Sequence, residues 1–169
     1  MSMGMLRGLR RVVDGAIVLL YGFMCLAILA QVAGRYLFNF STGSLVEAAT
    51  FAQVWMVMLA AGVAMRLAMH NSMDLLAQKL SRPLYRLAVA VSAAASLWFL
   101  GVTVVGGWPL LEIGRYQTSP ALEVPMLLAY VAIPVGCLYF ALEILLVGVR
   151  HWRLGKPEAP SLDTLEAKP

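Results

Sequence analysis

The stretch GRYLFN at residues 34–39 decides how the chain is organised, because it ends an apolar run that begins at residue 12. It places Arg35, two aromatic side chains and Asn39 where a membrane-spanning helix would meet water. A second apolar run follows at residues 45–66, with Glu47 near its start. The two runs therefore predict a helical hairpin whose short, charged connection lies at one face of a membrane.

The composition of the whole chain agrees with a lipid environment. Of its 169 residues, 61% are hydrophobic and 13% are charged, and the mean hydropathy is +0.80. A soluble domain carries about 25% charged residues. Because the chain has too little polar surface to cover a globule, we expect an all-α integral membrane protein.

Four apolar runs are each long enough to cross a hydrocarbon layer of ~30 Å at ~1.5 Å per residue. The expected spans are residues 12–34, 45–66, 84–105 and 125–148. The third is expected to end at the Gly-Gly-Trp-Pro sequence of residues 106–109, and Pro134 is expected to kink the fourth.

The membrane domain is expected to cover residues 12–150. Residues 1–11 form a basic lead ahead of it, and residues 151–169 form a polar tail that we expect to be disordered. The first apolar run is longer than the about 7–15 residues of a signal peptide, so we expect it to be retained as a span. Between the second and third spans, polar residues alternate with leucine and methionine, which predicts a short amphipathic helix at the membrane interface.

The lysines and arginines predict the orientation of the chain. Eleven of the 13 lie in the N-terminal lead, in the connection between the second and third spans, and in the tail. The other two connections hold one each, Arg35 and Arg115. Because such residues concentrate in cytoplasmic loops, both termini are expected to face the cytoplasm.

Arg35 and Glu47 are the sharpest pair of charged residues, and two interpretations remain open. They could form an ion pair across the hairpin, since an unpaired charge near hydrocarbon is costly. In the second interpretation, which is compatible with the first, Glu47 completes a capping box with Ser44 at a helix start, while Arg35 extends to the lipid headgroups. A substrate or ion site at these two residues is a lesser possibility. Glu143, in the last span, is expected at the membrane interface in preference to acting as a buried transport carboxylate. Trp55 is expected to pack or to contact lipid.

The sequence gives no support to an enzyme. It contains no Gly-rich phosphate loop, nucleophile motif or metal-ligand cluster, so no cofactor is expected. His70 and His151 both lie outside the predicted spans, which argues against a haem held between facing helices. His70 with Asp74 is better explained as a polar helix start than as a catalytic pair. No basic stripe interleaved with aromatics suggests a nucleic acid partner.

Scattered positions over most of the chain resemble a known family, the small integral membrane subunit (DctQ-like, four-span) of tripartite ATP-independent periplasmic (TRAP) transporters. The matching positions are Gln31, Arg35, Tyr36, Phe38, Asn39, Ser41, Glu47, Trp55, Arg66, His70, Asp74, the loop at residues 118–125, Tyr130 and Pro134. The family often shows a tryptophan and two adjacent acids where this chain has Leu-Val-Glu-Ala at residues 45–48, so only Glu47 carries over.

The resemblance implies a non-catalytic permease subunit in a bacterial inner membrane. Its implied partners are membrane lipids, a large multi-span permease subunit that holds the substrate and sodium sites, and a periplasmic substrate-binding protein. The whole would be a sodium-driven transporter of organic acids, in which this chain braces the large subunit and helps to dock the binding protein. The implied structural or interface residues are Arg35, Tyr36, Asn39, Glu47, Trp55, His70, Asp74 and Pro134. A stand-alone four-span transporter, or a membrane anchor of another inner-membrane complex, is the alternative.

Overall fold

A computed structural model describes residues 3–37, 43–68 and 81–154 of the chain. The all-α prediction is confirmed, because these residues are almost entirely helical. The helices, in chain order, are α1 (Met3–Leu37), α2 (Gly43–Ala68), α4 (Arg82–Tyr116), α5 (Leu127–Tyr130) and α6 (Ala132–Leu154).

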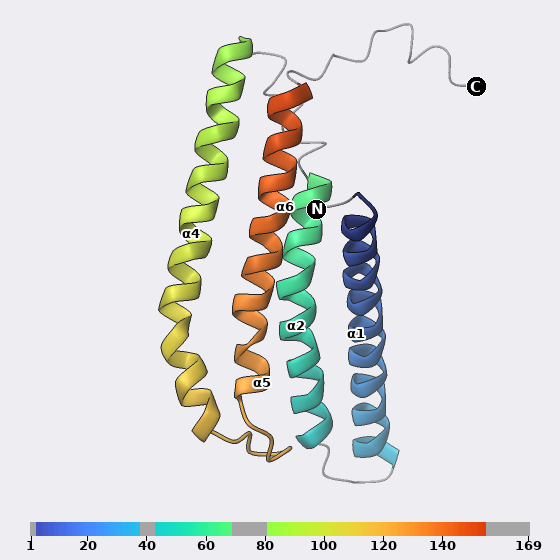
Figure 1. The fold of residues 1–169 in the computed structure, drawn as a ribbon. Coiled ribbons are helices and arrows are strands. Elements are labelled where there is room, and N and C mark those ends of the chain that lie inside the picture. Colours follow the sequence, from blue (N-terminus) through green and yellow to red (C-terminus); the bar gives the residue numbers. More distant parts are fainter. Residues whose placement is uncertain (1–2, 38–42, 69–80, 155–169) are drawn as a thin grey trace, which may run out of the picture.

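The long helices stand in a row in the order α1, α2, α6, α4 (Figure 1). The chain therefore inserts its last helix between the second and the third. The short helix α5 continues the line of α6 at one end and contacts α4. At the opposite end, where the N-terminus lies, α4 and α6 extend beyond α1 and α2 (Figure 1).

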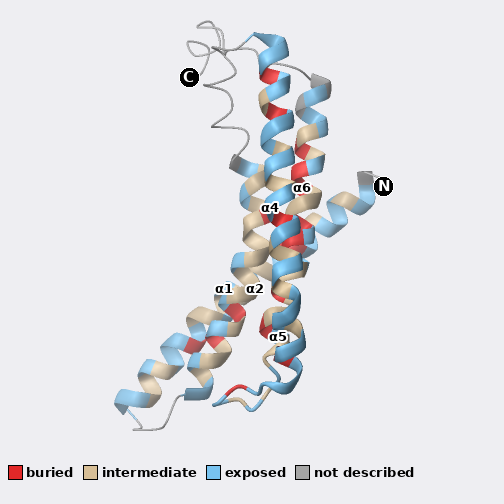
Figure 2. Ribbon diagram, turned by 90° about the vertical axis from the view of Figure 1, so that its left-hand side faces the viewer, coloured by how far each residue is buried: buried red, intermediate tan, exposed pale blue. Residues whose placement is uncertain are grey.

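All four long helices are apolar and long enough to cross a membrane. Most of their surface faces outward, as the extent of exposed ribbon shows (Figure 2). Burial is highest in α6, where 39% of the most apolar segment is buried, against 11% in α1 and in α4. The same share is 17% in α2, so the two inner helices of the row, α2 and α6, are more buried than α1 and α4 at its two ends. The chain is a multi-pass membrane protein.

Glycines bring α2 and α6 unusually close together. A Cβ atom at Gly62 would lie 2.5 Å from a ring carbon of Tyr139, and one at Gly136 would lie 2.6 Å from Cβ of Met58 and 2.9 Å from its carbonyl oxygen. Neither position can carry a side chain without movement of the neighbour. Small residues of this kind let helix backbones approach each other in membranes, where van der Waals packing replaces the hydrophobic effect as the driving force.

The prediction that residues 106–109 stop the third helix is wrong, since α4 continues through Pro109 to Tyr116. Proline removes one backbone N–H, and its ring crowds the carbonyl one turn earlier. A membrane helix tolerates this change where local adjustments satisfy the freed group. With 35 residues, α4 is roughly 50 Å long and exceeds the hydrocarbon layer.

The last span is divided at Val131, between α5 and α6. Pro134 stands three residues further on, in the first turn of α6. Because Pro134 has no N–H, the carbonyl of Tyr130 cannot receive the usual helical hydrogen bond from it. The expected disturbance therefore falls at the beginning of the helix, and α6 itself continues to Leu154.

Several sequence-based predictions lie outside the described residues. These are Asn39, His70 and Asp74, most of the amphipathic segment between the second and third spans, and the tail beyond residue 154.

Candidate functional site

Polar contacts between helices gather at two levels of the row. At the end where α4 meets α5, two side chains of α2 hold the connecting loop, and we call this set the clasp: Glu47, Trp55 and residues 117–128. Toward the N-terminal end of α1, charged side chains of α1, α2 and α6 form a second set, the charge cluster: Arg10, Asp14, Arg66, Tyr139 and Glu143.

The loop between α4 and α5 folds back on itself through backbone hydrogen bonds. The N–H of Met126 donates to the carbonyl of Gln117 at 2.9 Å, and that of Ser119 donates to Val124, also at 2.9 Å. The turn closes with the N–H of Glu123 donating to the carbonyl of Ser119 at 3.1 Å. Glu123 has a φ of 55°, a left-handed conformation that residues other than glycine seldom adopt. The loop thus has a defined and locally strained shape.

Glu47 fixes this loop against the start of α2. One carboxylate oxygen, Oε2, accepts hydrogen bonds from the backbone N–H groups of Ala121 at 2.9 Å and Leu122 at 2.8 Å. Hydrogen bonds to an ionised acceptor are stronger than those between neutral groups. The carboxylate therefore binds two backbone donors that the tight turn would otherwise leave to water.

Trp55 adds a second attachment two helical turns along α2 from Glu47. Its indole Nε1–H donates to the carbonyl of Leu128 at 2.9 Å. Leu128 belongs to α5, so the bond ties the start of the last span to α2. The sequence predicted only packing or lipid contact for Trp55. The hydrogen bond was not foreseeable, because its acceptor is a backbone atom 73 residues away.

The structure separates Arg35 from Glu47. Among the described residues, no hydrogen bond or ion pair joins the two, and Arg35 is exposed in the last turn of α1. Tyr36 beside it is 78% exposed. The capping box is also wrong in detail, since Ser44 lies inside α2 and Glu47 binds the loop instead. These contacts fit the interpretation in which Arg35 and Glu47 act separately, with Arg35 exposed and Glu47 bonded elsewhere.

The charge cluster centres on Glu143, of which only 1% is exposed. Arg10 donates to it through two nitrogens, Nε to Oε1 at 2.8 Å and a terminal nitrogen to Oε2 at 2.6 Å. The Tyr139 hydroxyl donates to Oε1 at 3.2 Å. Both carboxylate oxygens are thus occupied by donors from the protein. The expectation of an exposed side chain that reaches out from the last span is wrong for Glu143, because neighbouring helices cover it.

A second ion pair lies one turn along α1 from the first. Arg66 of α2 donates to both carboxylate oxygens of Asp14, at 2.9 and 3.2 Å. Because Arg10 and Asp14 are four residues apart, they share a face of α1. From this face α1 is bonded to α6 through Arg10 and to α2 through Asp14. Sequence reasoning missed both pairs, although the spacing of Arg10 and Asp14 on one helical face was a usable signal.

These contacts determine what the described residues can do chemically. The carboxylates of Asp14 and Glu143 are bound by arginines, and that of Glu47 is bound by backbone donors. In the described parts of the chain, no group of three or more His, Cys, Asp or Glu residues could hold a metal ion. The polar residues described above join helices and a loop to one another.

Comparison with known proteins gives two matches. The family described as "Tripartite ATP-independent periplasmic transporters, DctQ component" matches residues 24–154. The chain is also 31% identical, over 105 residues, to the C4-dicarboxylate TRAP transporter small permease protein DctQ of Rhodobacter capsulatus. That alignment covers 61% of this chain and 46% of the relative, so the chain spans about half of that protein's length. The region that the family matches, residues 24–154, contains Glu47 and Trp55, the two clasp residues of α2.

Proposed function

The chain belongs to the DctQ component family of tripartite ATP-independent periplasmic transporters, and we propose that it braces the large permease subunit of such a transporter without binding substrate itself. The family is a component of a transporter, so the chain is not an enzyme. The observation that carries the proposal is the pairing of the charges between the helices. Glu143 and Asp14 are bound by arginines of neighbouring helices, which suits a rigid support better than an ion pathway.

The open row of helices supports the bracing role. A row exposes two broad apolar faces, whereas a closed four-helix bundle turns much of that surface inward. Large side chains such as Leu19 of α1 and Val105 of α4 are 75% and 74% exposed. Such faces can pack against lipid and against the spans of a larger membrane protein. We propose that the large subunit covers part of this surface and holds the substrate and sodium sites, as a sodium-driven carrier requires.

We place the chain in the bacterial inner membrane with both termini in the cytoplasm. Arg10 lies near the start of α1, Arg66 near the end of α2 and Arg86 near the start of α4. These three helix ends lie toward the same end of the row, and basic residues favour the cytoplasmic side (Figure 1). The clasp then faces the periplasm. Reporter fusions after Gln117 should read as periplasmic and fusions after Ser81 as cytoplasmic, and a cytoplasmic reading at Gln117 would contradict this orientation.

The clasp is the part of the chain that we propose contributes to docking a periplasmic binding protein. Its loop is held in one shape by Glu47 and by its own backbone hydrogen bonds. A surface fixed before binding avoids the cost of ordering a loop during association. The substrate would be delivered by that protein, and we propose an organic acid such as a dicarboxylate, the substrate class in the name of the Rhodobacter relative.

Reconstitution tests the proposed function directly. Proteoliposomes that contain only this chain should take up no dicarboxylate, whether or not a sodium gradient is applied. Uptake should begin when the large subunit and the binding protein are added, and it should depend on the gradient. Uptake by the purified chain alone would overturn the proposal. Uptake by the large subunit and binding protein at an unchanged rate without this chain would contradict the bracing role.

A further inference from the structure

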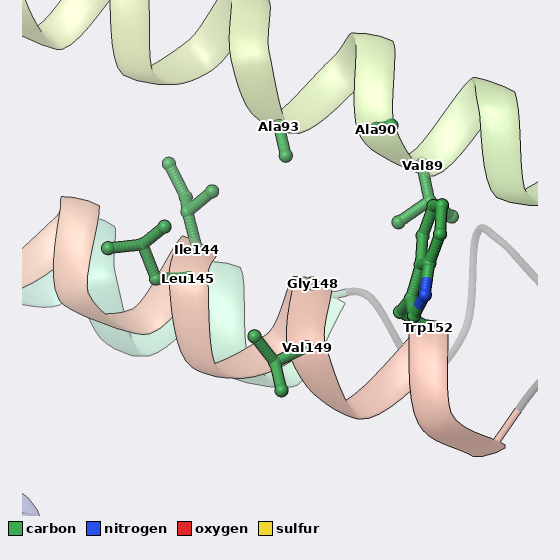
Figure 3. A pocket seen from close by; sticks show the side chains of 8 residues that line it. All are labelled: Val89, Ala90, Ala93, Ile144, Leu145, Gly148, Val149 and Trp152. Carbon is green, nitrogen blue, oxygen red and sulfur yellow. The ribbon is translucent and has the colours of Figure 1, made fainter.

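An apolar groove of about 220 Å³ runs between the first part of α4 and the last part of α6 (Figure 3). Its walls include Val89, Ala90 and Ala93 of α4 and Leu145, Gly148 and Trp152 of α6. Small residues keep it open, and a Cβ at Gly148 would meet no atom within 4 Å. The groove is open along its length, and the side chain of Leu145 is 52% exposed.

One end of the groove combines an aromatic ring with a positive charge. The guanidinium carbon of Arg86 lies 5.7 Å from the centre of the Trp152 ring. A guanidinium near a ring keeps N–H donors available for a phosphate, which it can bind through two of them. Arg82 is exposed one helical turn closer to the α4 N-terminus, on the same face as Arg86. Arginine followed by tryptophan and then aliphatic residues is the order of a membrane interface, from headgroups inward.

The charges on α4 place this groove at the edge of the hydrocarbon layer. No residue from 87 to 111 is charged, a length of roughly 37 Å at 1.5 Å per residue, so the layer fits between Arg86 and Glu112. Val89, the first groove residue of α4, lies three positions after Arg86, on the hydrocarbon side. A ligand that fills it must therefore be apolar at the deeper end and, to complement Arg86 and Arg82, anionic at the outer end.

We propose that this groove is a binding site for an anionic phospholipid, with an acyl chain between α4 and α6 and the phosphate at Arg86 and Arg82. The site goes beyond the transporter role, since it uses neither the clasp nor the charge cluster. A lipid fits these features better than a protein helix does. The groove lies between two helices, and its basic end is at headgroup depth, where anionic lipid is the abundant partner for arginine.

Native mass spectrometry of the full chain, released from mild detergent with mixed phosphatidylglycerol and phosphatidylcholine, measures this binding. The wild-type chain should retain phosphatidylglycerol in preference to phosphatidylcholine. One basic residue near the membrane surface contributes about a fivefold preference for anionic lipid, so Arg86→Gln should lower the preference by about fivefold. Gly148→Leu fills the groove and should lower retention of both lipids.

Matched controls separate this site from general lipid attraction. Arg115→Gln removes an arginine from the last turn of α4 at its opposite end, and Gly22→Leu adds the same side chain where a Cβ also meets nothing within 4 Å. Both should retain lipid as the wild type does. Equal losses in Arg115→Gln and Arg86→Gln, or undiminished retention in Gly148→Leu, would overturn the proposal.

A photoreactive residue in place of Val149, beside the groove, tests the occupant in the assembled transporter. The proposal expects crosslinks to phospholipid. Crosslinks to the large subunit instead would show that a protein covers the groove, and would overturn the lipid assignment. The mass spectrometry test is independent of the proposed transport role, because it measures lipid retention by the chain alone, without the other subunits.

Discussion

The charge cluster and the clasp both tie distant parts of the chain together, but with different kinds of bond. In the charge cluster, side chains bond to side chains, as Arg10 does to Glu143. In the clasp, Glu47 and Trp55 bond to backbone atoms of a loop and a short helix. A side-chain pair depends on the identity of two residues, whereas a backbone contact depends on one residue and the shape of the other segment. Substitutions should therefore be costly and mutually compensating in the charge cluster, and milder in the clasp.

The largest effect is expected from Arg10→Ala. It leaves the carboxylate of Glu143, 1% exposed, without its main partner, and breaking a buried ion pair in this way costs about 3–5 kcal/mol. Glu143→Gln should lower the free energy of unfolding less. The arginine side chain, 31% exposed, can turn toward water when its partner is lost. Denaturant unfolding of the full chain in mild detergent measures both values.

A double variant and a neighbouring arginine serve as controls for this asymmetry. Arg10→Met combined with Glu143→Gln should recover much of the stability lost in Arg10→Ala, because no buried charge remains. Arg11→Ala removes an exposed arginine next to Arg10 and should change little. Equal destabilisation by Arg10→Ala and Glu143→Gln would contradict this explanation. It would show that the different burial of the two side chains does not decide the cost of losing either partner.

The contact between α2 and α6 lies between the two sets and should give the next largest effect. Gly136→Ala places a methyl group 2.6 Å from Cβ of Met58 and 2.9 Å from its carbonyl oxygen. Because the obstacle includes backbone, the helices must separate, and overpacking of this kind costs about 1–3 kcal/mol. The same unfolding experiment checks it. Gly22→Ala, where a Cβ meets no atom within 4 Å, should be neutral or slightly stabilising, as alanine favours a helix. An unchanged free energy of unfolding in Gly136→Ala would show that α2 and α6 can separate at Met58 without cost.

The sequence predicts features that depend on residues close together in the chain better than contacts between residues far apart in it. Four spans follow from hydropathy alone, because a backbone in lipid must satisfy its own hydrogen bonds within each helix. The end predicted at residues 106–109 failed because Pro109 removes a single hydrogen bond from a helix of 35 residues. The partner of Glu143 is Arg10, 133 residues away on α1, and the two meet only because α1 and α6 both pack against α2 in a particular order. Hydropathy does not specify that order.

In the clasp, Glu47→Ala should loosen the loop without unfolding the bundle. Two hydrogen bonds to a carboxylate are lost, and because the site is partly exposed we expect a cost of about 1–2 kcal/mol. Amide hydrogen exchange should accelerate at Ala121 and Leu122. Glu47→Gln retains a carbonyl acceptor and should give an intermediate rate. Unchanged exchange at these two amides in Glu47→Ala would show that the loop keeps its shape without the carboxylate.

The smallest effect is expected for Arg35, and it decides between the two interpretations of the hairpin charges. Arg35 is exposed and has no bond to Glu47, so Arg35→Ala should change the free energy of unfolding by no more than about 0.5 kcal/mol. Exchanging the residues, Arg35→Glu with Glu47→Arg, tests the pair directly. An ion pair would survive the exchange, and stability would partly return. The structure predicts no return, because arginine has no acceptor for the N–H groups of Ala121 and Leu122. The exchanged chain should therefore match Glu47→Ala in both unfolding and amide exchange. A recovery in the exchanged chain would instead show that charge complementarity between the two positions, and not the bond to the loop, is what stabilises this end of the molecule.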